Sequence, residues 1–136
     1  MNVSFIFTEE GGRVSEIGKR LQEVERRIEA ARGRSPYGQD VILVAVTKFH
    51  PLENMEEVLR LGVTQVGENR VQEMEEKHDR LTLPAVWHLQ GHLQRNKVKK
   101  AVALADLIQS VDSAGILKEI DKRAEQAGKK QDVLLE

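Results

Sequence analysis

Cysteine is absent from this sequence of 136 residues, so the chain has no disulfide framework, no thiolate metal site and no thiol nucleophile. This absence fits a cytoplasmic protein, which is the location we expect. No apolar run approaches the roughly 18 residues of a membrane span, and we expect no membrane partner. The formal net charge is only −1, so the protein as a whole lacks the charge of a polyanion binder.

Several familiar catalytic and nucleotide-binding motifs are also missing. The sequence contains no P-loop, no GxGxxG loop, no Ser-His-Asp spacing and no paired-carboxylate motif. A basic cluster at Arg95, Lys97, Lys99 and Lys100 has no interleaved aromatic residues, and we interpret it as a solvated helix face. Contact with phosphate or nucleic acid is the weaker alternative at this net charge, so no nucleic-acid partner is predicted.

Apolar runs and amphipathic segments alternate along the chain. After a predicted helix at 17–31, strand-like runs occur at 41–48, 64–69, 84–89, 107–111 and 132–136. Such alternation predicts a parallel α/β sheet, and strand spacings of roughly 20–25 residues are typical of a (β/α) barrel. A complete TIM-type barrel needs eight strands and about 250 residues. We therefore predict one domain, residues 1–136, that forms about five strands of a C-terminally truncated barrel, whose open edge could allow self-association.

The most apolar run of the chain, residues 41–48, ends in Lys48. Its β-branched residues predict a strand covered on both faces. An amine at the end of such a strand lies at the rim of the core, where partial desolvation favours its neutral, nucleophilic form. A neutral lysine amine forms a Schiff base with a carbonyl compound. The alternative is a lysine that snorkels from a strand end into water, and position alone favours this alternative.

Polar residues also lie at the C-terminal ends of the next three predicted strands, in Glu68-Asn69, His88-Leu89-Gln90-Gly91 and Ser110-Val111-Asp112. The C-terminal ends of barrel strands face the active site, so these groups should converge on one rim with Lys48. Taken alone, Asn69 fits an N-cap of a helix at 70–80, and His88 fits a histidine that is hydrogen-bonded within the core. His92 follows His88 by four residues, but Gly91 intervenes and no third ligand is evident, so we predict no metal site.

Three segments of the sequence occur in order, each at a predicted strand-to-helix junction: VAVTK at 44–48, VGENRVQE at 66–73 and WHLQGHLQRNK at 87–97. Together they resemble the pyridoxal phosphate homeostasis protein family, over nearly the whole chain from the first helix onward. The resemblance implies a barrel like the N-terminal domain of alanine racemase, with pyridoxal 5′-phosphate held as an aldimine on Lys48. It further implies that Asn69 lies near the cofactor ring and His88 on the same rim.

The resemblance also implies a non-catalytic role in intracellular homeostasis of this cofactor, because the family has no established turnover. In the family, the cofactor phosphate is held by later strands that these 136 residues do not contain, so we expect weak retention. Two alternatives stay open: a racemase-like enzyme that uses pyridoxal phosphate, and a truncated barrel that retains no cofactor. Fold-related racemases use a tyrosine from a second domain, whereas the only tyrosine here, Tyr37, precedes the first strand.

Overall fold

The computed structural model describes residues 14–136, and it confirms the predicted alternation of helices and strands. The elements are α1 (Glu16–Arg34), β1 (Val44–Val46), α2 (Leu52–Arg60), β2 (Gln65–Glu68), α3 (Val71–His78), β3 (Val86–Leu89), α4 (Val98–Leu104), β4 (Leu107–Val111), α5 (Ala114–Gln126) and β5 (Asp132–Leu135). A short 3₁₀ turn, Arg95–Lys97, precedes α4. All five strands are parallel and adjacent in chain order, β1-β2-β3-β4-β5. This is the partial (β/α) barrel that the strand spacing predicts.

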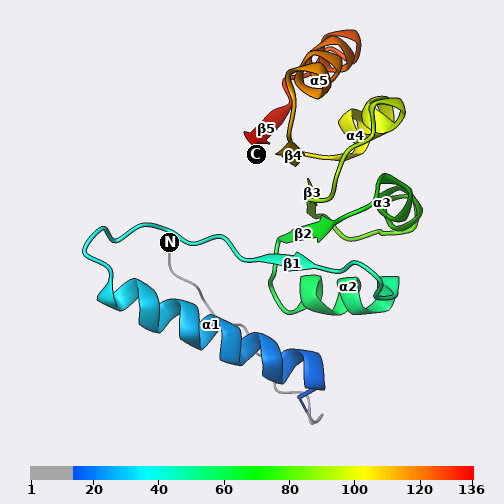
Figure 1. Ribbon diagram of the computed structural model, residues 1–136. Helices are drawn as coiled ribbons and strands as arrows, with labels where there is room; N and C mark the ends of the chain where they lie inside the picture. The colour runs from blue at the N-terminus through cyan, green and yellow to red at the C-terminus, as the bar shows by residue number, and fades with distance from the viewer. Residues whose placement is uncertain (1–13) are drawn as a thin grey trace.

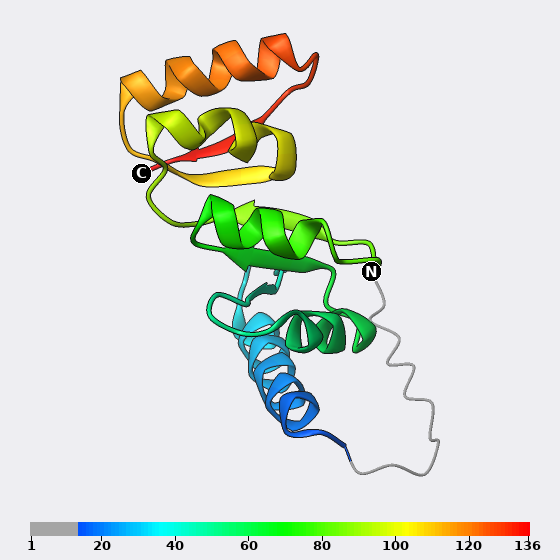
Figure 2. The ribbon, with the colours of Figure 1, turned by 90° about the vertical axis from the view of Figure 1, so that its right-hand side faces the viewer.

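The strands form a curved row with α2, α3, α4 and α5 along its outer side (Figure 1). Figure 2 views that outer side, with these four helices stacked in front of the strands. Each helix returns the chain from the end of one strand to the start of the next, which parallel pairing requires. None of the described helices lies on the inner, concave side of the row (Figure 1).

The hydrophobic core lies between the sheet and the outer helices. Val66 of β2 and Met74 of α3 are completely buried, and the Trp87 ring of β3 lies 5.4 Å from that of His78 on α3. Burial of a large apolar side chain stabilises a fold by about 1.5–3 kcal/mol, so this layer supplies most of the stability. The other members of the core are Leu52, Met55, Val71, Leu89, Leu93, Val98, Ala101, Val102, Ala105, Ile108, Val111, Ile116, Ile120 and Ala124.

The first strand is shorter and more open than the sequence predicts. The prediction of a strand that reaches Lys48 is wrong, because β1 ends at Val46, and Val41 and Ile42 are 49% and 66% exposed. Coverage of both faces is also wrong, since Val46 is 44% exposed. The physical reason is position: among residues 14–136, β1 is an edge strand that pairs only with β2, and no described helix covers its concave face (Figure 1). Apolar composition alone does not distinguish such an edge from a central strand.

Within residues 14–136, no helix combines the length and the apolar character needed to cross a membrane.

Candidate functional site

The carboxyl ends of β1, β2 and β3 meet at one end of the sheet. The Thr47 backbone N–H donates to the Gly67 carbonyl at 3.0 Å, so the ladder between β1 and β2 continues one residue past Val46. Lys48 and Asn69 follow directly, both half-buried. His88 is the register partner of Gly67 on the neighbouring strand β3. The structure therefore brings Lys48, Asn69 and His88 to the carboxyl ends of three adjacent strands, with Lys48 and Asn69 just past the ends of β1 and β2 and His88 within β3.

Lys48 lies in a tight turn that joins β1 to α2. The His50 N–H donates to the Thr47 carbonyl at 3.1 Å, which closes a four-residue turn with Lys48 in its second position. The third residue, Phe49, has a φ of 63° although it is not glycine. Type II turns need a positive φ at this position and usually place glycine or asparagine there. A bulky residue in this conformation costs about 1–2 kcal/mol, which the surrounding contacts must offset.

A buried charged network lies directly behind this turn. The Lys77 ammonium on α3 donates to the Thr47 carbonyl at 2.8 Å, to Glu68 Oε1 at 2.7 Å and to Glu73 Oε1 at 2.9 Å. The Thr47 hydroxyl donates to the same Glu68 oxygen at 2.6 Å. Glu68 is fully buried and Lys77 is 7% exposed. All three ammonium donors of Lys77 are therefore used, two of them on carboxylates.

Sequence reasoning missed the part that Glu73 and Lys77 play. Their i,i+4 spacing is typical of an exposed helix pair, which contributes only a few tenths of a kcal/mol. The overlooked signal is Glu68, a carboxylate at the end of a buried strand that therefore needs a buried cation. Within the described residues, Glu68 Oε2 has no hydrogen-bond partner, so the network is not fully satisfied.

Glu73 connects this network to the chain that follows Lys48. Its Oε1 accepts the Phe49 backbone N–H at 2.7 Å. Burial by itself would raise the pKa of Glu73, but hydrogen bonds from Lys77 and Phe49, with the nearby charges of Lys77 and Arg70, hold that pKa below its usual range. The side chain is therefore a carboxylate acceptor at neutral pH.

The backbone of Asn69 is fixed by close packing against the next loop. A Cβ added to Gly91 would lie only 2.1 Å from the Asn69 carbonyl oxygen, so no larger residue fits there without a shift. The Ser110 hydroxyl, at the end of β4, donates to the Gly91 carbonyl at 2.6 Å and holds this loop from its other side. The prediction that Asn69 caps the following helix is wrong, because α3 begins at Val71 and its N-cap residue is Arg70.

His88 is held by glutamines from the strands on either side. Its Nε2 lies 2.6 Å from Oε1 of Gln65 on β2, and its Nδ1 lies 2.8 Å from Nε2 of Gln109 on β4. Since an amide oxygen only accepts and an amide nitrogen only donates, the ring is neutral with its proton on Nε2. Burial lowers the pKa of His88, and the charge of Asp106 opposes that effect only in part.

The free energy of unfolding should therefore decrease as the pH is lowered, because the unfolded chain protonates this histidine at a higher pH than the folded chain does. Because the folded pKa lies below the ordinary value of about 6.5, the unfolded state binds more protons once the pH drops below that value. Urea unfolding at a series of pH values from about 8 to 5 should show this loss in the wild type, and a smaller loss in His88→Gln. His92→Gln, at an exposed site, is the matched control. Equal slopes for wild type and His88→Gln would contradict the assignment.

The side chains at the end of β4 do not form a metal site with those at the ends of the other strands. Asp112 accepts a contact from exposed His92, with Nδ1 and Oδ2 at 3.1 Å. Across residues 14–136, no group of three or more His, Cys, Asp or Glu side chains could hold a metal ion.

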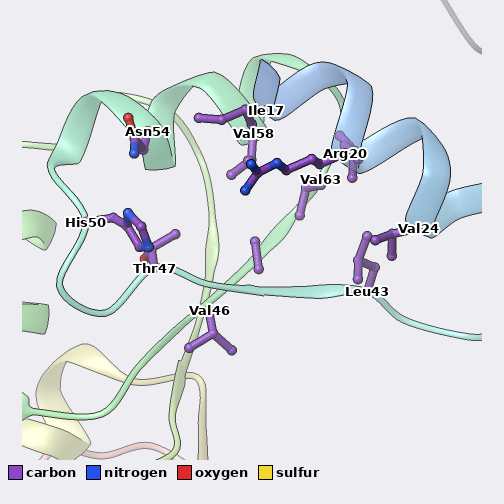
Figure 3. Close-up of a pocket in the computed structure, with 12 residues that line it drawn as sticks. Ile17, Arg20, Val24, Leu43, Val46, Thr47, His50, Asn54, Val58 and Val63 are labelled. Atoms are coloured by element: carbon purple, nitrogen blue, oxygen red, sulfur yellow. The ribbon is translucent and has the colours of Figure 1, made fainter. Parts of the chain in front are cut away.

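An apolar cavity of ≈ 310 Å³ lies elsewhere, between α1, β1 and α2. The residues that line it include Ile17, Val24, Leu43, Val46, Val58 and Val63 (Figure 3). Lys48, Asn69 and His88 are not among its lining residues. Thr47 and His50, the first and last residues of the turn that contains Lys48, do line the cavity.

Residues 20–136 match the alanine racemase N-terminal domain family. The chain belongs to this family. A pyridoxal phosphate homeostasis protein of Aquifex aeolicus is 39% identical over 120 residues, which are 87% of this chain and 53% of that protein. The human pyridoxal phosphate homeostasis protein is 31% identical over 122 residues, 82% of this chain and 44% of that one.

Solved structures agree with this alanine racemase N-terminal domain assignment. PipY of Synechococcus elongatus PCC7942, with pyridoxal phosphate bound, superimposes with a TM-score of 0.68 at 36% identity and covers 81% of this chain and 52% of PipY. The same protein without the cofactor gives a TM-score of 0.68 at 39% identity, over 79% of this chain and 50% of PipY. The chain thus spans about half the length of these relatives. The resemblance read from the three sequence segments is confirmed.

Proposed function

We propose that this chain binds pyridoxal 5′-phosphate through the Lys48 amine and serves homeostasis of that cofactor without turnover of its own. The observation that supports this most is the setting of Lys48, half-buried in a hydrogen-bonded turn at the carboxyl end of β1. In barrels of this kind, that end of the strands carries the functional groups. The names of the relatives and the pyridoxal phosphate bound to PipY also support cofactor binding by this chain.

The residues at this end suit the cofactor's chemistry. Pyridoxal phosphate supplies an aldehyde and an electron sink when bound, and a lysine amine is the protein group that reacts with the aldehyde. We propose that Asn69, whose backbone is fixed against Gly91, lies beside the cofactor ring. Both ring nitrogens of His88 are already engaged by Gln65 and Gln109, so we propose that it supports the ligand side of the sheet as a neutral polar group.

A carrier role is supported by the position of the single tyrosine. Tyr37 is 84% exposed and lies between α1 and β1, before the amino end of β1, whereas Lys48 follows the carboxyl end. It is therefore poorly placed to exchange a proton with a ligand on Lys48. A racemase-like activity would show as Lys48-dependent racemisation of alanine above the rate of free cofactor, and we expect none.

The open concave face should make binding weak and reversible. Val46 is 44% exposed there, and Val86 and Leu134 are 38% and 51% exposed. Water that reaches a bond between amine and aldehyde hydrolyses it, and a closed site normally excludes that water. We therefore expect the cofactor to exchange during gel filtration.

The test is a titration with pyridoxal phosphate, followed by absorbance and by borohydride reduction before desalting. Wild-type protein should retain the reduced cofactor at roughly one equivalent, and Lys48→Ala should retain about tenfold less, since the proposed amine is gone. Lys19→Ala, at an exposed position of α1, is the control and should behave as wild type. Retention by Lys48→Ala equal to that of wild type would refute the proposal and favour a barrel fragment without a specific ligand.

We also propose that the chain forms the first part of a single barrel domain, and that it works in the cytoplasm. The outer edges of β1 and β5 have no strand partner among the described residues, which would support self-association through the open sheet edge.

A further inference from the structure

Helix α3 contacts the backbone on both sides of Lys48. On the amino side, Lys77 Nζ donates to the Thr47 carbonyl at 2.8 Å. On the carboxyl side, Glu73 Oε1 accepts the Phe49 N–H at 2.7 Å. Lys77 and Glu73 also pair with each other at 2.9 Å, so the two contacts form one unit on a single helix face. The residue between the two contacts is Lys48.

The turn needs such support because Phe49 has an unfavourable backbone conformation. Its φ is 63°, yet its side chain is 72% exposed and gains little from packing. The Arg70 guanidinium lies 5.7 Å from the Phe49 ring centroid, a weak contact at an exposed site. A residue stays in this region of conformational space only where its surroundings hold it there, and such residues occur often at functional sites. Here the surroundings are the Glu73 and Lys77 contacts.

We propose that Glu73 and Lys77 are positioning residues that fix the Thr47–His50 turn and thereby set the reactivity of the Lys48 amine. This inference rests on the proposed function, since it assigns a role to residues that support the cofactor-binding lysine. Neither side chain contacts the amine itself. Each acts through a backbone group of the residue before or after Lys48.

A purely structural role explains the network less well. A buried ion pair is often no more stabilising than apolar side chains of the same volume. What apolar side chains cannot do is accept a backbone N–H and donate to a backbone carbonyl at two fixed points. Both points here belong to the residues that flank Lys48, and Glu68 is the buried counter-charge that keeps Lys77 in place.

The test compares the modification of Lys48 with that of Lys19, an exposed lysine in the same sample, by peptide mapping. Two reagents are used separately: pyridoxal phosphate with borohydride, and a small acylating reagent that needs no cofactor site. In wild type, the ratio of Lys48 to Lys19 modification should differ from one with both reagents. Glu73→Ala should move both ratios toward one by about fivefold, the factor expected for a lost hydrogen bond. The control is Glu76→Ala, which should leave both ratios unchanged, because among the described residues the Glu76 carboxylate accepts only from Gln72 on the same helix.

Glycine at position 49 provides the rescue. Because glycine adopts a positive φ without cost, Phe49→Gly added to Glu73→Ala should restore the wild-type ratios to within about twofold. Glu73→Gln covers the case in which Glu73→Ala does not fold. It keeps an acceptor oxygen for the Phe49 N–H, so its modification ratios should stay close to those of the wild type. An unchanged acylation ratio in folded Glu73→Ala, or no rescue by glycine, would overturn the inference. A wild-type pyridoxal phosphate ratio near one would instead overturn the proposed function, while the acylation ratios still decide the positioning role.

Discussion

Replacing Lys77 by methionine should lower the free energy of unfolding by about 3–5 kcal/mol. The substitution keeps most of the side-chain volume but removes the ammonium that pairs with Glu68 and Glu73. Glu68 is fully buried, so its carboxylate would lose its only cationic partner among the described residues without gaining access to water. Urea unfolding followed by circular dichroism measures the change.

Two further variants show whether the unpaired charge is the cause. Lys100→Met breaks a pair of similar length, 2.7 Å to Glu75, but its side chains are 55% and 35% exposed, so it should cost less than about 1 kcal/mol. Adding Glu68→Gln to Lys77→Met removes the buried charge and should recover part of the loss. A cost for Lys77→Met no greater than that for Lys100→Met would show that the network is not a buried one in solution.

Replacing Gly91 by alanine should cost about 3 kcal/mol or more, because it forces two backbone segments apart. The added Cβ would lie 2.1 Å from the Asn69 carbonyl oxygen and 2.8 Å from its carbonyl carbon. Backbone atoms at a strand end have less room to move than a flexible side chain. The shift should also displace the half-buried Asn69 and weaken retention of the cofactor.

The matched control is Gly33→Ala, which adds the same methyl group near the end of α1. Nothing lies within 4 Å of that Cβ, and alanine is a better helix former, so this variant should be neutral or stabilising by up to about 1 kcal/mol. Unfolding curves of the two variants, measured side by side, give the comparison. Similar stabilities for both would mean that the contact between Gly91 and Asn69 is looser than 2.1 Å implies.

Much of the fold could be predicted from sequence because its signals are local. The alternation of apolar strands with amphipathic helices sets the order of the elements, and strand spacing indicates the barrel. The local sequence pattern could not show which faces of each strand are covered by other parts of the chain. The run at 41–48 reads as a fully covered strand, yet β1 is an edge strand with Val46 exposed, since coverage depends on segments distant in the sequence.

The sequence allowed us to predict which residues lie at the candidate site, but not which side chains they contact. Strand register alone brings Lys48 and Asn69 to the same end of the sheet. The partners of His88, in contrast, come from two other strands, and a glutamine in a sequence carries no sign of its partner. Lys77 is the clearest omission: its position on a helix suggests a solvated lysine, and only the three-dimensional arrangement shows that it is buried against Glu68.

The central claim is tested most directly by incubating the protein with pyridoxal phosphate, reducing the product with borohydride and mapping the labelled peptides. Every lysine in the chain competes for the aldehyde in one reaction, so exposed residues such as Lys19 and Lys118 serve as internal references. The account predicts that the pyridoxyl group is found mainly on the peptide that contains Lys48. A map in which Lys48 carries no more of the label than the exposed lysines would contradict it.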